Sequence, residues 1–130
     1  MPRLVVYGRS TPCPDMNRWM RWLATHQVDY VAFDINVDAE AHRKVVEWTG
    51  HQSVPTLVIA PDDGVDPVRA PDALPPGRGP RGIDRGTMLT EPASGQVDAF
   101  LERNGIPFTT VEVAEPAPRR WFWQRWLRTS

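Results

Sequence analysis

The chain has 130 residues and a formal net charge of −1, with 41% hydrophobic and 24% charged residues. This length and balance fit one globular domain with a modest core, and they give no general attraction to nucleic acid or to a membrane. The single cysteine, Cys13, excludes an intramolecular disulfide framework, and three histidines make a Cys/His metal site improbable. We expect a reducing compartment, by default the cytoplasm, because no apolar segment has the length of a signal core or a membrane span.

The first half of the chain predicts strands and helices in alternation. An apolar run at 4–7 and an alternating run at 31–35 have the patterns of strands. Between them, a Pro and an Asp directly after Cys13 are typical of a helix start, and apolar residues follow at helical spacing. Asp38 is suited to cap a second helix that ends near Gly50. This order implies two parallel strands joined by a right-handed crossover.

The second half of the chain predicts an antiparallel pair of strands and a third helix. Residues 56–60 are rich in β-branched side chains and have the pattern of a core strand. Residues 61–86 are rich in Pro, Gly, Asp and Arg; we interpret them as a mobile insertion, although composition alone does not separate a functional loop from disorder. A short strand at 87–89 and a helix over about 92–104 follow. Residues 108–113 fit either one more strand or a segment that lies over the domain.

The sequence therefore predicts an α/β domain, βαβ followed by ββα, over residues 1–114, with the insertion between its last two strands. Two prolines then mark a linker into a tail at 115–130, where tryptophans, a phenylalanine and arginines are concentrated. On a helix, most of these aromatic side chains share one face. For Trp121, Trp123 and Trp126 we favour docking on the domain or on a second copy over binding of a partner protein. We rank membrane contact last and expect no binding of nucleic acid.

Cys13 lies where a loop after a strand meets the start of a helix. Unpaired backbone N–H groups and the positive end of the helix dipole stabilise a thiolate at such a place, and the thiolate is the nucleophilic form of cysteine. The alternative is that Cys13 serves as a small buried hydrophobic residue, the commonest role of a lone cysteine. Its position alone does not decide between these two roles.

Two segments resemble glutaredoxins and mycoredoxin-like proteins. The run C-P-D-M-N-R at 13–18 is similar to the C-P-x-C active-site turn of that family, and Q-S-V-P-T at 52–56 is similar to its T-V-P segment. The resemblance covers about residues 4–105 without the insertion, and it implies a thioredoxin-like fold. It also implies that Pro55 is a cis-proline lying against the reactive cysteine, and that the backbone of Val54 pairs with the thiol substrate.

The resemblance further implies which residues hold a low-molecular-weight thiol of the glutathione or mycothiol type. Pro14 belongs to the active-site turn, and Gln52 matches an Arg or Gln that contacts the small thiol in relatives. Arg9 stands one residue away from the position where the family usually has a lysine. Met16 replaces the second cysteine, and because a thioether does not attack a disulfide, no intramolecular exchange is available.

The sequence thus predicts a monothiol thiol–disulfide oxidoreductase that acts on disulfide-containing proteins, with Cys13 as its catalytic residue. A first alternative is a [2Fe–2S] carrier, in which two chains each give Cys13 and two small thiols complete the ligands. The chain lacks the C-G-F-S signature of that branch, and otherwise we expect no metal. A second alternative is a thioredoxin-fold adaptor without redox activity, because fold alone does not fix function.

Overall fold

A computed structural model describes residues 1–93 and 95–111 of the chain, so the tail with its three tryptophans lies outside the described residues. In chain order the elements are β1 (Arg3–Gly8), α1 (Pro14–Thr25), β2 (His26–Val28), β3 (Tyr30–Asp34), α2 (Ala39–Thr49), β4 (Thr56–Ala60), β5 (Met88–Thr90), α3 (Gln96–Arg103) and β6 (Phe108–Thr110). None of the helices in these ranges is long and apolar enough to cross a membrane.

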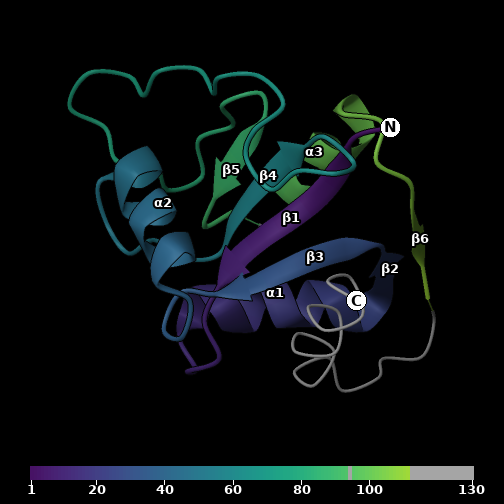
Figure 1. Cartoon of the computed structure of the whole chain (residues 1–130). Helices are drawn as coiled ribbons and strands as arrows, with labels where there is room; N and C mark the ends of the chain where they lie inside the picture. Colours follow the sequence, from purple (N-terminus) through teal and green to yellow (C-terminus); the bar gives the residue numbers. More distant parts are fainter. Residues whose placement is uncertain (94, 112–130) are drawn as a thin grey trace.

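Four strands form one mixed sheet in the order β3-β1-β4-β5 (Figure 1). β1 is parallel to β3 and antiparallel to β4, and β4 is antiparallel to β5. The predicted α/β order is confirmed, with a parallel pair in the first half and an antiparallel pair in the second. A mixed four-stranded sheet with three helices agrees with the thioredoxin-like domain that the resemblance implies.

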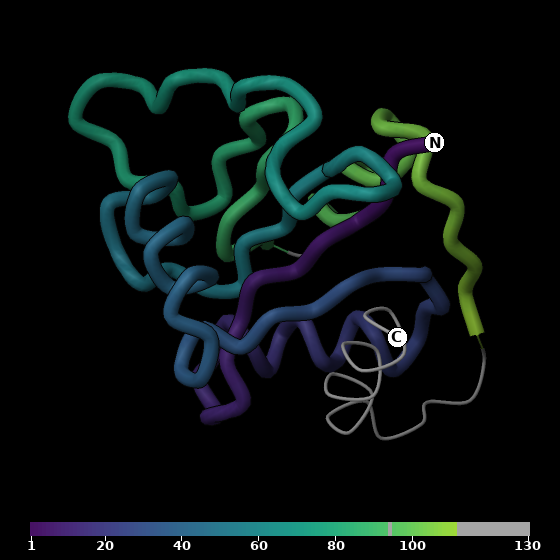
Figure 2. Tube along the Cα trace, viewed as in Figure 1, coloured from purple at the N-terminus to yellow at the C-terminus, as the bar shows by residue number. Residues whose placement is uncertain are grey.

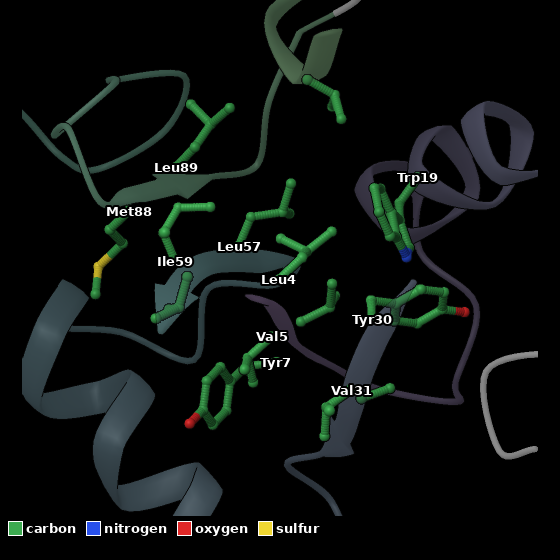
Figure 3. Packing of buried hydrophobic residues seen from close by; sticks show 14 of the residues in the cluster. Leu4, Val5, Tyr7, Trp19, Tyr30, Val31, Leu57, Ile59, Met88 and Leu89 are labelled. Carbon is green, nitrogen blue, oxygen red and sulfur yellow. The ribbon is translucent and has the colours of Figure 1, made fainter. Parts of the chain in front are cut away.

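The two faces of the sheet carry different layers of the core. Alternate side chains of β1 point to opposite faces, so Tyr7 lies on one side and Leu4 on the other (Figure 3). Tyr7 stacks on Phe33 and meets Trp48 of α2 edge-on, with ring centroids 5.4 and 5.2 Å apart. On the other face Trp19 of α1 packs on Tyr30 at 6.0 Å. Both faces are therefore covered, which explains why β1 and β4 are buried along almost their whole length.

The ends of the helices follow local signals in two cases and depart from the sequence prediction in one. Asp38 caps α2 by accepting a hydrogen bond from Ala41 N at 3.0 Å, and Gly50 ends this helix in the left-handed conformation, as predicted. The third helix begins at Gln96, four residues later than expected from the proline at 92. Gly95 is left-handed, with φ of 86°, and the Gln96 side chain accepts a hydrogen bond from Ala93 N at 2.7 Å, so the chain turns before the helix starts.

A second, two-stranded sheet joins β2 to β6, and the sequence analysis missed β2. The strand alternative for residues 108–113 is confirmed for 108–110, which pair with residues 26–28. Trp22 and His26 stack with ring centroids 4.1 Å apart, and Phe108 packs beside both rings. The indole of Trp22 also donates a hydrogen bond to Asp98 at 2.6 Å, which ties α1 to α3.

The insertion at 61–86 forms the wide loop in the upper left of Figures 1 and 2. It contains no helix or strand, but hydrogen bonds attach it to the domain at several points. Near its start, Val68 N donates to Ile59 O at 2.8 Å. At its end the buried Arg85 donates to the backbone oxygens of Trp48 and Asp72, at 2.9 and 2.7 Å. Whether this loop moves in solution stays a prediction of the sequence analysis.

Candidate active site

Cys13 is the N-cap residue of α1. Its backbone is extended, its carbonyl oxygen accepts the first helical hydrogen bond from Asn17 N at 2.8 Å, and its Sγ accepts from Met16 N at 3.5 Å. The side chain is half-buried, so the sulfur is neither sealed in the core nor free in solvent. A backbone N–H and the positive end of a helix therefore act on this sulfur.

The loop between β1 and Cys13 is held by a buried carboxylate. Asp34, only 1% exposed, accepts hydrogen bonds from Ser10 N at 3.2 Å and from Asn36 N at 2.8 Å. Ile35 N also donates to Gly8 O at 2.8 Å. These bonds fix the backbone at the C-terminal end of β1, and through it the start of α1.

Val54 and Pro55 lie at the same end of the sheet. The peptide bond between them is cis, both residues are buried, and β4 begins directly afterwards. Thr56 stands opposite Tyr7 in the antiparallel register, so this turn faces the end of β1 from which the loop to Cys13 departs. The topology thus brings the two motifs of the resemblance to one edge of the sheet.

The structure also brings together Arg9 and Gln52. Arg9 Nη2 donates a hydrogen bond to the backbone oxygen of Gln52 at 2.7 Å, across 43 residues of sequence. The side chain of Gln52 is exposed, and Pro14 is exposed as the first residue of α1. The six residues named from the sequence therefore lie at this edge of the sheet, on its loops and at the start of α1. Their roles toward a thiol stay predictions.

A charged cluster that the sequence analysis did not find lies at the first turn of α1. The Asp15 carboxylate pairs with Arg18 through Oδ1 at 2.8 Å and with Arg81 through Oδ2 at 2.7 Å. Arg81 also pairs with Glu91 at 2.9 Å, and Glu91 N donates to Pro55 O at 2.8 Å. The cluster therefore joins the first turn of α1, the insertion and the cis-proline turn. No signal in the sequence predicts the contact with Arg81, which comes from a loop 66 residues further along the chain.

The surroundings shift the pKa values of the two carboxyl groups of this cluster in opposite directions. Burial opposes ionisation of Asp15, but hydrogen bonds with Arg81, Glu91 and Arg18 outweigh it and lower the pKa of this carboxyl. Burial, together with the hydrogen bond and the negative charge of Asp15, raises the pKa of Glu91. The pair therefore favours an ionised Asp15 beside a Glu91 that holds its proton more tightly than a free side chain does.

The backbone of Glu91 has an unusual conformation. Its φ of 47° lies in the left-handed region, which residues with a side chain seldom adopt. Its amide is nonetheless bonded to Pro55, and its carboxyl to Arg81. Backbone outliers of this kind are concentrated at functional sites, so the conformation supports placing Glu91 in the site.

A cavity of about 240 Å³ opens beside this cluster, between α1 and the start of α3. Arg18, Arg21 and the rings of Trp19 and Trp22 line it on the side of α1. In the described ranges, no group of three or more His, Cys, Asp or Glu side chains is arranged to hold a metal ion.

In comparison with known proteins, residues 4–63 match the family model described as glutaredoxin. No curated protein and no solved structure matches the chain. The matched segment runs from β1 to the residues just after β4, so it contains Cys13 and the Val54–Pro55 turn. Residues 4–63 are therefore similar to the glutaredoxin family, whose members typically use glutathione, and the single cysteine is consistent with a monothiol variant.

Proposed function

We propose that this protein is a monothiol thiol–disulfide oxidoreductase that removes a low-molecular-weight thiol from proteins. The observation that carries the proposal is the position of the only cysteine, half-buried at the N-terminus of α1 with its sulfur accepting a backbone N–H. The cis-proline turn at the same edge of the sheet supports it, because the family resemblance gives this turn the task of holding the substrate disulfide. A structural cysteine would instead be expected deep in the core.

The reaction consists of two exchanges. In the first, the Cys13 thiolate attacks the small-thiol sulfur of a mixed disulfide; a new S–S bond joins Cys13 to the small thiol, and the target leaves as a thiolate that takes up a proton. In the second, a further small-thiol thiolate attacks the small-thiol sulfur on Cys13. This step releases the Cys13 thiolate and a small-thiol disulfide, so one molecule of reduced small thiol is consumed for each target reduced.

The neighbouring residues are proposed to serve these steps in different ways. The N-terminus of α1 stabilises the Cys13 thiolate both as attacking group and as leaving group. Arg9, Gln52 and the Val54 backbone hold the small thiol, which is of the glutathione or mycothiol type. Because Met16 takes the place of a second cysteine, the adduct on Cys13 waits for a second thiol molecule.

Mass spectrometry of the full chain after exposure to oxidised glutathione, and separately to oxidised mycothiol, tests this proposal. We expect one adduct on Cys13 that disappears when the reduced form of the same thiol is added. The Cys13→Ser variant, which differs by one atom, should gain no mass. A folded wild-type chain whose cysteine stays unmodified by both disulfides would contradict the proposal.

A further inference from the structure

The insertion returns to the active site at Arg81, and its backbone there is firmly placed. Arg81 forms a parallel bridge with Thr90 at the end of β5, and Gly82 N donates to Thr90 O at 2.8 Å. Gly82 O in turn accepts from the Gln96 side chain at 2.8 Å. Gly82 is left-handed, with φ of 67°, a conformation that a glycine adopts without strain. The chain therefore fixes Arg81 beside the cis-proline turn.

The guanidinium of Arg81 is held at one end and open at the other. A single nitrogen, Nη1, donates to Asp15 Oδ2 at 2.7 Å and to Glu91 Oε2 at 2.9 Å. Within the described part of the chain, Nε and Nη2 have no protein partner, and the side chain is 57% exposed. Two carboxyl groups thus orient the forked guanidinium of Arg81, while its remaining N–H groups are available to a planar anion.

The surrounding charge also favours an anion. Asp15 is paired with two arginines, since Arg81 donates to one of its oxygens and Arg18 donates to the other at 2.8 Å. Burial and Asp15 raise the pKa of Glu91, which reduces the negative charge there. The N-terminus of α1 adds the positive end of a helix dipole. A carboxylate placed beside Arg81 therefore meets more positive than negative charge.

We propose that Arg81, supplied by the insertion, is a specificity-determining residue that binds a carboxylate of the small thiol joined to Cys13. This inference rests on the proposed function and adds a residue of the insertion that selects, among small thiols, those that carry a carboxylate. Asp15, the partner of Arg81, lies two residues after Cys13 in the first turn of α1. A peptide-like thiol of three residues reaches about 10 Å when extended, which is longer than the single helical turn of about 5.4 Å in which Cys13 and Asp15 lie.

The test compares two mixed disulfides of one peptide on the full-length protein. In the first the peptide carries glutathione, which has two carboxylates; in the second it carries β-mercaptoethanol, which has none. The ratio of kcat/KM for the first substrate over that for the second is measured for wild type, Arg81→Gln and Arg81→Lys. Arg78→Gln is the matched control, an exposed arginine of the same insertion for which the described residues hold no side-chain partner.

We expect Arg81→Gln to lower this ratio about tenfold or more, the typical effect of losing a hydrogen bond to a charged group. Arg81→Lys keeps the charge without the fork, so its ratio should be intermediate, and Arg78→Gln should keep the wild-type ratio. If Arg81 only ties the insertion to α1, both substrates are affected equally and the ratio stays constant, which would overturn the inference. If wild-type Cys13 reacts with neither substrate, the proposed function fails and this inference fails with it.

Discussion

Asp15 and Glu91 bring two carboxyl groups to one guanidinium nitrogen at the thiol site. Such a pair titrates as a unit, and hydrogen bonds with the two arginines favour ionisation of Asp15 over Glu91. A protonated Glu91 then donates a hydrogen bond to an ionised Asp15. The arrangement has a consequence for stability, because a carboxyl that holds its proton more tightly when folded is destabilised where it must ionise.

We predict that Glu91→Gln raises the free energy of unfolding at neutral pH relative to wild type. Below about pH 4 Glu91 is protonated in both states and contributes nothing, so wild type and variant should differ little. As the pH rises above the ordinary carboxyl value, the unfolded chain loses this proton before the folded one, and wild-type stability falls. Glutamine keeps an N–H donor for Asp15 at every pH, so the variant escapes this loss.

Urea unfolding of both proteins between pH 4 and pH 8 measures the effect. The exposed Glu102 on α3 supplies the matched control, since Glu102→Gln changes the same group away from the cluster. A Glu91→Gln protein that is less stable than wild type by the same amount at every pH would show that the carboxyl is only a structural partner of Arg81.

Single residues of the site differ in how far the sequence could predict them. The N-cap position of Cys13 follows from its immediate neighbours, because a proline at the next position marks the first turn of a helix. The link from Arg9 to Gln52 joins two loops already named from the resemblance. The contact between Arg81 and Glu91 had no such signal, because it depends on how a loop without periodic pattern returns to the sheet.

At the scale of elements, the insertion has one buried attachment that makes a prediction. Arg85 is 9% exposed, and its guanidinium donates to the backbone oxygens of Trp48 on α2 and Asp72 within the loop. Burial lowers the pKa of the Arg85 guanidinium, because the loss of water around it disfavours the charged form. The hydrogen bonds must offset that cost, and removing them leaves two carbonyl groups without their donor.

We therefore predict that Arg85→Met lowers the free energy of unfolding by about 2–3 kcal/mol, since hydrogen bonds from a charged group contribute roughly 1.5–3 kcal/mol each and the loss of burial cost compensates in part. Equilibrium unfolding in urea measures this change. Arg78→Met, at an exposed position of the same loop, should stay within about 0.5 kcal/mol of wild type. Equal stability of the two variants would mean that the loop end contributes nothing to the fold.

Elements with strong local signals were predictable, and elements that depend on distant partners were not. The second helix has a capping aspartate and a terminal glycine, and both act as the sequence indicates. β2 has only three residues and exists because β6 pairs with it from about 80 positions further on, so no local pattern marks it. The start of α3 was placed too early because a proline suggests a first turn, whereas the left-handed Gly95 sets the true beginning.

At the scale of the whole molecule, the described residues form one hydrophobic core. Its buried hydrophobic members run from Leu4 to Ile106, and at the end of the described chain Val111 N donates to Thr25 O at 2.9 Å. The two sheets and three helices account for the contacts that bury these side chains. The boundary expected from the sequence, a domain ending at residue 114, lies outside the described residues and stays a prediction.

We predict that a chain ending at residue 114 folds cooperatively and keeps the reactivity of Cys13. Because the buried core of the described residues ends at Ile106, the free energy of unfolding of the shortened chain should differ from that of the full chain by less than about 1 kcal/mol. Urea unfolding followed by far-ultraviolet circular dichroism measures stability without relying on the tail tryptophans. A larger loss would mean that the tail, through residues such as Trp121, Trp123 and Trp126, docks on the domain and contributes to its stability. Unchanged stability together with a fall in solution mass would instead point to docking on a second copy.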